Sequence, residues 1–200
     1  MNPNRKTSSL VTLGVPAPGA ISRVSIGDFL RRAAQRDPHK TVLVDGEVRL
    51  SYGELDARVS RCANALIADG LLPGERVVTL CNNSLDFVVA FFGIQRAGLI
   101  WVPVNTGLGL DDVRYIVEHA EARYAIVDSA LLLRPELRML LETQPGRGLV
   151  IEGPAAGAFL AFNAALDAQP ANEPDVEIHD RDVSQIMYTS GTTGRPKGVM

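Results

Sequence analysis

The residues best suited to chemistry lie near the end of the chain, in one stretch of hydroxyl, glycine and lysine residues. The stretch reads Tyr188-Thr189-Ser190-Gly191-Thr192-Thr193-Gly194-Arg195-Pro196-Lys197-Gly198. Its hydroxyl groups can donate hydrogen bonds to anionic oxygens, and they belong to Thr189, Ser190, Thr192 and Thr193. Gly191, Gly194 and Gly198 allow positive φ and close backbone approach, so that successive N–H groups can converge on an anion. Lys197 adds a mobile positive charge. We therefore expect residues 188–198, called the phosphate loop below, to bind phosphate groups.

The phosphate loop is not a Walker A motif, which reads G-x-x-x-x-G-K-[ST] and opens a helix. Counting from Gly191, the second glycine of that motif falls on Pro196, and Gly198 follows the lysine in place of a hydroxyl residue. Proline and glycine also disfavour a helix here. Residues 183–188 alternate and are β-prone, and Val199-Met200 is apolar again. The pattern predicts a strand-to-strand connection.

Helical and strand patterns alternate through the rest of the chain. Helical spacing of apolar residues predicts helices from Ile26 to before Pro38, from Ser51 to Gly70, over 85–97, over 111–120 and from Pro135 to Leu141. Short apolar runs predict strands at 41–44, 47–50, 76–81, 99–104, 123–127 and 149–151, with Asp45-Gly46 as a type I′ turn between the first two. A further helix is expected over 155–168, and the stretch 169–182 links it to the strand 183–188. This order predicts an α/β fold with a largely parallel sheet covered by helices on both faces.

The second predicted helix carries the clearest local signals. Ser51 and Glu54 form a capping box, and Gly70 can end the helix. Five of its residues are predicted to face the core: Leu55, Val59, Cys62, Leu66 and Ile67.

Composition excludes several classes of function. The net charge of −3 gives no reason to expect a nucleic acid or an anionic membrane as partner. Cys62 and Cys81 suit core packing in a reducing compartment better than a disulfide, and the sequence holds no zinc spacing. His39, His119 and His179 are isolated from one another, and we expect surface residues rather than metal ligands. No apolar run reaches the length of a membrane span, which favours a cytoplasmic protein.

One motif resembles a dinucleotide fingerprint and is rejected. Residues 107–112 follow a predicted strand and precede a predicted helix, but Asp112 replaces the third glycine. Asp111 and Asp112 would also repel a pyrophosphate, whereas they stabilise the helix N-terminus itself.

The phosphate loop is similar, position for position, to the signature of the adenylate-forming superfamily, which contains acyl-CoA synthetases, peptide-synthetase adenylation domains and luciferases. Four upstream segments also resemble landmarks of this family in the expected order: residues 51–55, 70–77, 96–98 and 102–105. Asn105 favours the acyl-CoA synthetases. The resemblance implies that residues 21–200 are the N-terminal part of an AMP-binding domain, ending just after the phosphate loop. Residues 1–20 hold prolines and glycines without a helical period, which predicts a flexible arm.

The resemblance also implies a reaction. A carboxylic acid, most often a fatty acid, attacks Mg-ATP to form an acyl adenylate, and coenzyme A then takes the acyl group as a thioester. Lys197 is implied as the catalytic residue, acting on the departing pyrophosphate. Thr189, Ser190, Gly191, Thr192, Thr193, Gly194, Lys197 and Gly198 are implied as binding residues for the ATP phosphates. The chain holds only three lysines, which argues against a general solubility role for Lys197.

Full members of this family are far longer than 200 residues. We expect their Mg²⁺ and coenzyme A sites to follow Met200, and the chain alone to be inactive. An alternative is a non-catalytic product that binds a phosphate ligand or a protein partner, while the failed Walker A match disfavours a kinase-like protein. Because the phosphate loop ends two residues before the chain does, we expect Val199 and Met200 to hold it poorly. We also expect self-association through an unpaired strand at 183–188.

Overall fold

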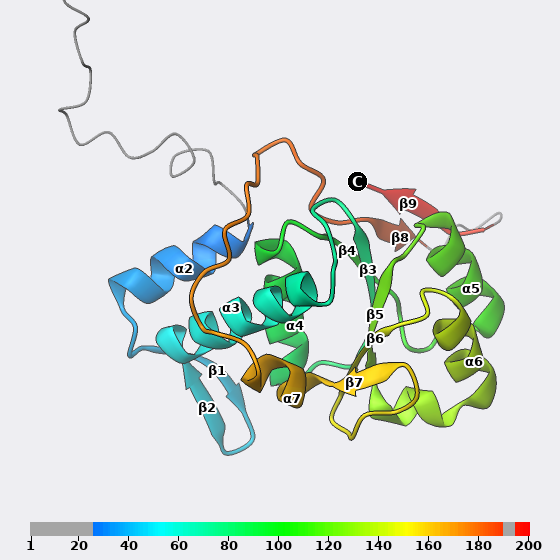
Figure 1. Ribbon diagram of the computed structural model, residues 1–200, viewed down its shortest axis with the longest axis horizontal. Helices are drawn as coiled ribbons and strands as arrows, with labels where there is room; N and C mark the ends of the chain where they lie inside the picture. The colour runs from blue at the N-terminus through cyan, green and yellow to red at the C-terminus, as the bar shows by residue number, and fades with distance from the viewer. Residues whose placement is uncertain (1–25, 190–194) are drawn as a thin grey trace, which may run out of the picture.

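The computed structural model describes residues 26–189 and 195–200, so the proposed arm 1–20 and residues 190–194 of the phosphate loop lie outside it. Its centre is a parallel five-stranded sheet with the strand order β4-β3-β5-β6-β7 (Figure 1). The strands are β3 (Arg76–Leu80), β4 (Ile100–Pro103), β5 (Tyr124–Asp128), β6 (Gly148–Ile151) and β7 (Phe159–Ala161). This confirms the predicted α/β class and the parallel sheet.

Helices cover both faces of this sheet (Figure 1). One side holds α2 (Ile26–Arg36), α3 (Tyr52–Ala68), α4 (Leu85–Arg96) and α7 (Phe162–Asp167). The other side holds α5 (Leu110–His119), the 3₁₀ turn η1 (Ser129–Leu133) and α6 (Pro135–Thr143). Because side chains alternate along a strand, Tyr124 and Ile126 pack toward α3 and α4, while Ala125 and Val127 pack toward α5 and α6. Each face of the sheet therefore has its own hydrophobic core.

The local signals of α3 are confirmed. Ser51 Oγ accepts a hydrogen bond from the Glu54 N–H at 3.3 Å, and a Glu54 carboxylate oxygen accepts one from the Ser51 N–H at 2.8 Å. Gly70 ends the helix region with a φ of 85°. Of the five residues predicted to face the core, four are fully buried and Ile67 is partly buried.

Two sequence predictions are wrong in detail. The hairpin of β1 (Thr41–Asp45) and β2 (Val48–Ser51) turns at Gly46-Glu47, because Asp45 pairs with Val48. Only Gly46 of the described hairpin residues has a positive φ, 55°, whereas a type I′ turn needs two such residues.

The predicted helix over 155–168 begins instead with a strand. β7 pairs in parallel with β6, and α7 starts only at Phe162. Phe159 is fully buried where β7 joins the sheet, and Gly157 before it has a φ of 59°. The free edge of β6 thus imposes a strand on residues that have a helical pattern.

Two short strands flank the middle of the phosphate loop, as the predicted strand-to-strand connection requires, although the first is shorter than the predicted strand 183–188. β8 (Met187–Thr189) pairs in antiparallel fashion with β9 (Lys197–Val199). The expectation that the last residues would hold the loop poorly is wrong for Val199, which pairs with Met187. Upstream of β8, Gln185 forms a parallel bridge to Trp101 of β4. Residues of 183–188 therefore have neighbours within the chain, and self-association through this strand stays a prediction.

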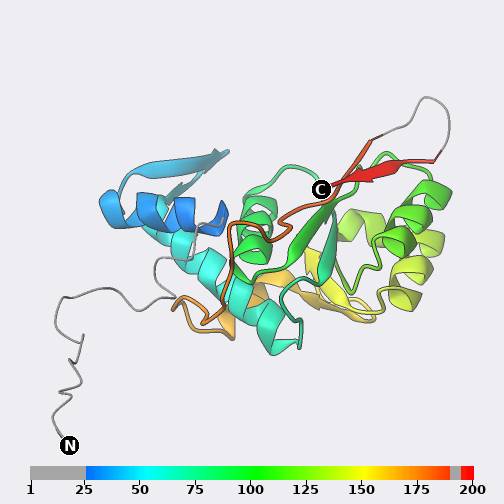
Figure 2. The same cartoon turned by 90° about the horizontal axis from the view of Figure 1, so that it is seen from above.

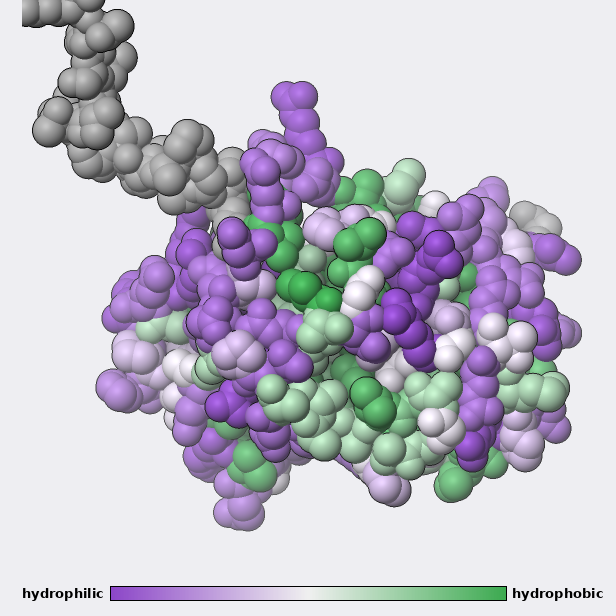
Figure 3. All heavy atoms as spheres, in the orientation of Figure 1, coloured by the Kyte–Doolittle hydropathy of each residue, from purple (hydrophilic) through white to green (hydrophobic). Residues whose placement is uncertain are grey.

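The surface of the described residues is mixed in polarity. Figure 3 shows hydrophobic residues gathered over α7 and β7, where Leu160 is 56% exposed. Among the residues that the structure describes, no helix is long and apolar enough to cross a membrane.

Candidate functional site

The backbone leading into β8 is fixed by β4 and α4. The Trp101 N–H donates to the Ser184 carbonyl at 3.0 Å, and the Ile186 N–H donates to the Trp101 carbonyl at 2.9 Å. The side-chain amide of Gln95, on α4, also donates to the Ser184 carbonyl at 2.9 Å, and Gln95 is only 3% exposed. A buried amide that is hydrogen-bonded in this way fixes one backbone position. The phosphate loop is therefore attached to the central sheet through residues 184–186.

Thr189 and Lys197 face each other across β8 and β9. They are partners in the strand register, and directly opposite residues of an antiparallel pair project from the same face. Both residues are exposed, and Lys197 has no ion pair within the described part of the chain. The structure thus brings two of the predicted phosphate-binding residues together, at the point where the chain enters and leaves residues 190–194. Gly198 lies in β9, and the five remaining predicted binding residues lie outside the described residues: Ser190, Gly191, Thr192, Thr193 and Gly194.

Tyr188 and Gly198 form the neighbouring register pair and face the opposite side of the hairpin. A methyl group on Gly198 would lie 3.0 Å from Cγ2 of Ile186 and 3.2 Å from Cζ of Tyr188. Gly198 lies in β9 and is absent from the described glycines with positive φ, so the conformational freedom of glycine is not used here. Its missing side chain instead makes room for the ring of Tyr188.

Helix α5 contacts this side of the hairpin. The phenol oxygen of Tyr188 lies 2.7 Å from Nδ1 of His119, and the two rings meet edge to face at 5.8 Å. The guanidinium carbon of Arg195 lies 5.2 Å from the ring centre of Tyr115. His119 is exposed, as predicted, but its contact with Tyr188 was not predicted from the sequence. The spacing of Tyr115 and His119 places both rings on one face of a helix, but no sequence pattern indicates what that face contacts.

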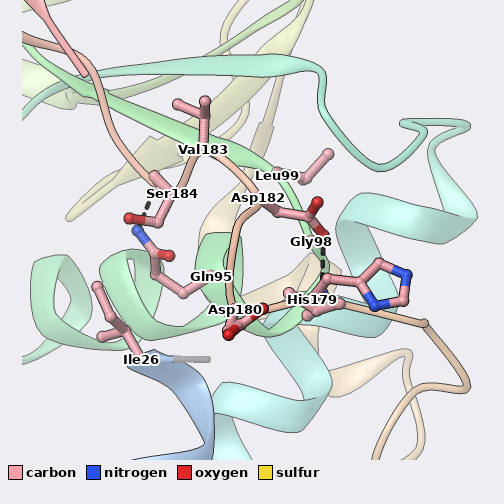
Figure 4. A pocket seen from close by; sticks show the side chains of 10 residues that line it. Ile26, Gln95, Gly98, Leu99, His179, Asp180, Asp182, Val183 and Ser184 are labelled. Carbon is pink, nitrogen blue, oxygen red and sulfur yellow. Dashed lines mark hydrogen bonds between the residues drawn. The ribbon is translucent and has the colours of Figure 1, made fainter. Parts of the chain in front are cut away.

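A pocket of about 140 Å³ lies at the base of this segment, away from the phosphate loop (Figure 4). Its lining includes Gln95, Gly98, His179 and Asp182, together with Ser184. In Figure 4 the hydrogen bond from Gln95 to Ser184 closes one side, and Asp182 accepts from the His179 N–H at 2.8 Å. These two hydrogen bonds fix the backbone of residues 179–184 where it lines the pocket.

Neither cysteine is set up as a nucleophile. Burial raises the pKa of the Cys62 thiol to about 12, and the nearby charge of Asp86 adds to the effect. Burial, followed by the charge of Asp128, also raises the pKa of Cys81. Both cysteines are free, and Cys62 lies in the core as predicted. Within residues 26–189 and 195–200, no group of three or more His, Cys, Asp or Glu residues could hold a metal ion.

Comparison with known proteins identifies the class. Residues 30–200 match the family of AMP-binding enzymes. The chain is 36% identical over 173 residues to a 3-hydroxybenzoate–CoA/4-hydroxybenzoate–CoA ligase of Thauera aromatica, covering 85% of this chain and 33% of that protein. It is 33% identical over 178 residues to the long-chain-fatty-acid–CoA ligase FadD13 of Mycobacterium tuberculosis, covering 88% of this chain and 34% of that protein.

Structure comparison agrees with the sequence match. The anthranilate CoA ligase AuaEII, solved with anthranoyl-AMP, superimposes with a TM-score of 0.81 at 28% identity, over 92% of this chain and 36% of that one. The chain therefore belongs to the AMP-binding enzyme family, as the resemblance of the phosphate loop indicated. It spans about a third of the length of the curated relatives that it matches.

Proposed function

We propose that this chain is the phosphate-binding part of an acyl-CoA ligase. In the proposed reaction, a carboxylate oxygen attacks the α-phosphorus of ATP, and the bond to the bridging oxygen breaks to release pyrophosphate. The sulfur of coenzyme A then attacks the acyl carbon, and AMP leaves. The observation that carries the proposal is the phosphate loop, with its Tyr-Thr-Ser-Gly-Thr-Thr-Gly-Arg-Pro-Lys-Gly sequence on a β-hairpin, in a chain that belongs to the AMP-binding enzymes.

In this proposal Lys197 is the catalytic residue of the chain. Negative charge grows on the pyrophosphate as the bond to the α-phosphorus breaks, so a cation beside it stabilises the transition state more than bound ATP. Thr189 lies opposite Lys197, and the exposed position of both leaves their polar atoms accessible to a ligand. The predicted donors Ser190, Thr192 and Thr193 and the glycines Gly191, Gly194 and Gly198 complete the proposed phosphate site.

Mg²⁺ and coenzyme A are proposed only for the complete reaction. Mg²⁺ would neutralise the phosphate oxygens of ATP, but the described residues offer no cluster of ligands for it, and we assign it no residue of this chain. No described residue is assigned to coenzyme A either. The arm 1–20, the AMP-binding part 21–200 and the cytoplasmic location stay predictions from the sequence.

The carboxylic acid is the least constrained part of the proposal. The sequence resemblance suggested a fatty acid, whereas the matched ligases include one named for hydroxybenzoates and one named for long-chain fatty acids. A panel of acids separates these classes. We propose to measure pyrophosphate released from Mg-ATP by a protein of the relatives' full length that contains this chain, with benzoates, hydroxycinnamates and fatty acids of increasing length, with and without coenzyme A. Release that depends on one class of acid supports the proposal, and the absence of acid-dependent release across the panel contradicts it.

A further inference from the structure

Helix α5 carries two rings that both reach the β8–β9 hairpin. Tyr115 and His119 are four residues apart, and their ring centres lie 5.2 Å apart. Residues at this spacing lie on the same face of a helix. Figures 1 and 2 show α5 beside the hairpin. One helical face therefore meets the strand pair that bounds residues 190–194.

The ring of His119 contacts the chain just before residues 190–194. Tyr188 is two residues before position 190, and its phenol oxygen lies 2.7 Å from Nδ1 of His119. Burial, and then the neighbouring Tyr115, raise the pKa of Tyr188. Its O–H is therefore kept at neutral pH and can donate to Nδ1 when the imidazole proton is on Nε2.

The ring of Tyr115 contacts the chain just after residues 190–194. Arg195 is the first described residue after positions 190–194, and its guanidinium carbon lies 5.2 Å from the ring centre of Tyr115. A cation at this distance over an aromatic face is attracted to the ring. This contact with α5 fixes the chain at Arg195, on the other side of residues 190–194 from Tyr188.

These contacts leave the proposed catalytic face of the hairpin free. Tyr188 faces α5, whereas Thr189 and Lys197 project from the other face and are exposed. Contacts on the face of Tyr188 fix the backbone of the hairpin, and so the direction of Thr189 and Lys197, without occupying the face from which these two side chains project. Donors held in place before the reaction are those that stabilise a transition state well.

We propose that Tyr115 and His119 are positioning residues for the β8–β9 hairpin: α5 contacts the chain at Tyr188 and at Arg195, on either side of residues 190–194, and this pair of contacts, the clamp, sets where Thr189 and Lys197 stand. This role rests on the proposed function, since it matters only if the loop binds the phosphates of ATP. It predicts that loosening the clamp lowers the rate of adenylate formation without lowering the stability of the whole fold.

The first test measures the clamp itself, by hydrogen exchange of the amides of 187–189 and 197–199 in the 200-residue chain. Tyr188→Phe removes only the O–H, and His119→Leu removes the acceptor at similar size. A single hydrogen bond corresponds to about a two- to tenfold change in local opening. We expect exchange in both segments to accelerate by that factor in each variant, with the thermal midpoint unchanged.

Matched variants distinguish the bond from a general effect. His119→Asn keeps a polar atom near the position of Nδ1 and should restore slow exchange. His39→Leu alters another exposed histidine, in the turn before β1, and should leave the hairpin unchanged. The double variant His119→Leu/Tyr188→Phe should exchange no faster than either single variant, because both remove the same bond. Unchanged exchange in the single variants, or a double variant showing the product of the two effects, overturns the clamp.

The second test measures the consequence, by single-turnover adenylate formation in a protein of the relatives' full length that contains this chain. His119→Leu and Tyr115→Leu should slow this step by about two- to tenfold while the KM for the carboxylate stays constant, and Tyr115→Phe, which keeps the ring, should react at the wild-type rate. If hydrogen exchange of the hairpin accelerates but the rate of adenylate formation is unchanged, the positioning role is overturned. A wild-type protein that forms no adenylate overturns the proposed function instead, while the exchange data still report on the clamp.

Discussion

Gly198 lies opposite Tyr188 across the β8–β9 hairpin, and a methyl group on Gly198 would come within 3.2 Å of Cζ of that ring. The ring cannot move away freely, because its phenol oxygen is hydrogen-bonded to His119 on α5. A glycine at this position thus lets Tyr188 lie between β9 and α5. Space, and not an unusual backbone conformation, explains this glycine.

Gly198→Ala should therefore weaken the hairpin. Inserting one methyl group into a filled space typically costs about 1–3 kcal/mol, and here we expect the lower end because the hairpin is at the surface. Hydrogen exchange of 187–189 and 197–199 measures the effect. Val199→Ala serves as the control, since Val199 is in the same strand but 56% exposed. Equal exchange in the two variants would show that Tyr188 adapts without cost.

The contact between α3 and α4 should be much less tolerant. A methyl group on Gly93 would lie 2.5 Å from Sγ and 2.7 Å from Cβ of Cys62, both in the fully buried core. We expect Gly93→Ala to lower the free energy of unfolding by about 1–3 kcal/mol, measured by urea denaturation. Gly109→Ala is the matched control, because Gly109 has no atom within 4 Å of an added methyl group and a φ of −68°. Combining Gly93→Ala with Cys62→Ala should recover part of the loss. A stability loss at Gly109 as large as that at Gly93 would contradict this account.

Alkaline pH should destabilise the fold through its buried thiols. Burial raises the pKa of Cys62 from 9.0 to about 12, so between these values the folded thiol keeps a proton that the unfolded one has lost. The stabilisation is complete below about pH 9 and is lost as pH rises through the folded pKa. Cys81 is shifted in the same direction. The free energy of unfolding, measured from pH 8 to 11, should fall less steeply in Cys62→Ala than in the wild type. Parallel curves would mean that Cys62 has an ordinary pKa in the fold.

The sequence predicted those parts of the fold that depend on neighbouring residues. The capping box of Ser51 and Glu54 and the alternation of apolar runs are local patterns, and they located α3 and most strands of the sheet correctly. β7 was missed because its conformation depends on pairing with the free edge of β6, which the apolar pattern of residues 155–168 does not reveal. The strand pair around the phosphate loop was predicted from Pro196, Gly198 and the alternating residues before them.

Contacts between distant segments explain what the sequence could not show at the site. His119 and Tyr188 are 69 residues apart, and nothing in the spacing of either suggests the other. Gln95 likewise meets Ser184 only because α4 and the segment 184–186 both lie beside β4. A sequence motif reveals the residues proposed to contact a ligand, such as Lys197. It does not reveal the residues, such as His119, that are proposed to hold those residues in place.

The 200-residue chain alone should make no acyl-CoA. Adenylation needs the carboxylate to be held in line with the α-phosphorus, and such positioning can be worth about 7–11 kcal/mol of the barrier in favourable cases. The chain spans about a third of the length of its relatives, and none of its described residues is assigned to the carboxylate. Acid-dependent release of pyrophosphate by the pure chain, well above the rate without acid, would contradict this prediction and support a complete active site within it.

The central claim, that Lys197 stabilises the departing pyrophosphate, is tested most directly by Lys197→Ala in a protein of the relatives' full length that contains this chain. Lys40→Ala is the matched control, because Lys40 is the other lysine in the described part of the chain and is also exposed. Pre-steady-state adenylate formation should fall about 100-fold or more in Lys197→Ala, corresponding to about 3 kcal/mol, while ATP affinity from a parallel titration falls far less. The rate of Lys40→Ala should match the wild type. Equal losses in rate and in ATP affinity would show that Lys197 only holds bound ATP, and an unchanged rate would contradict its place in the site.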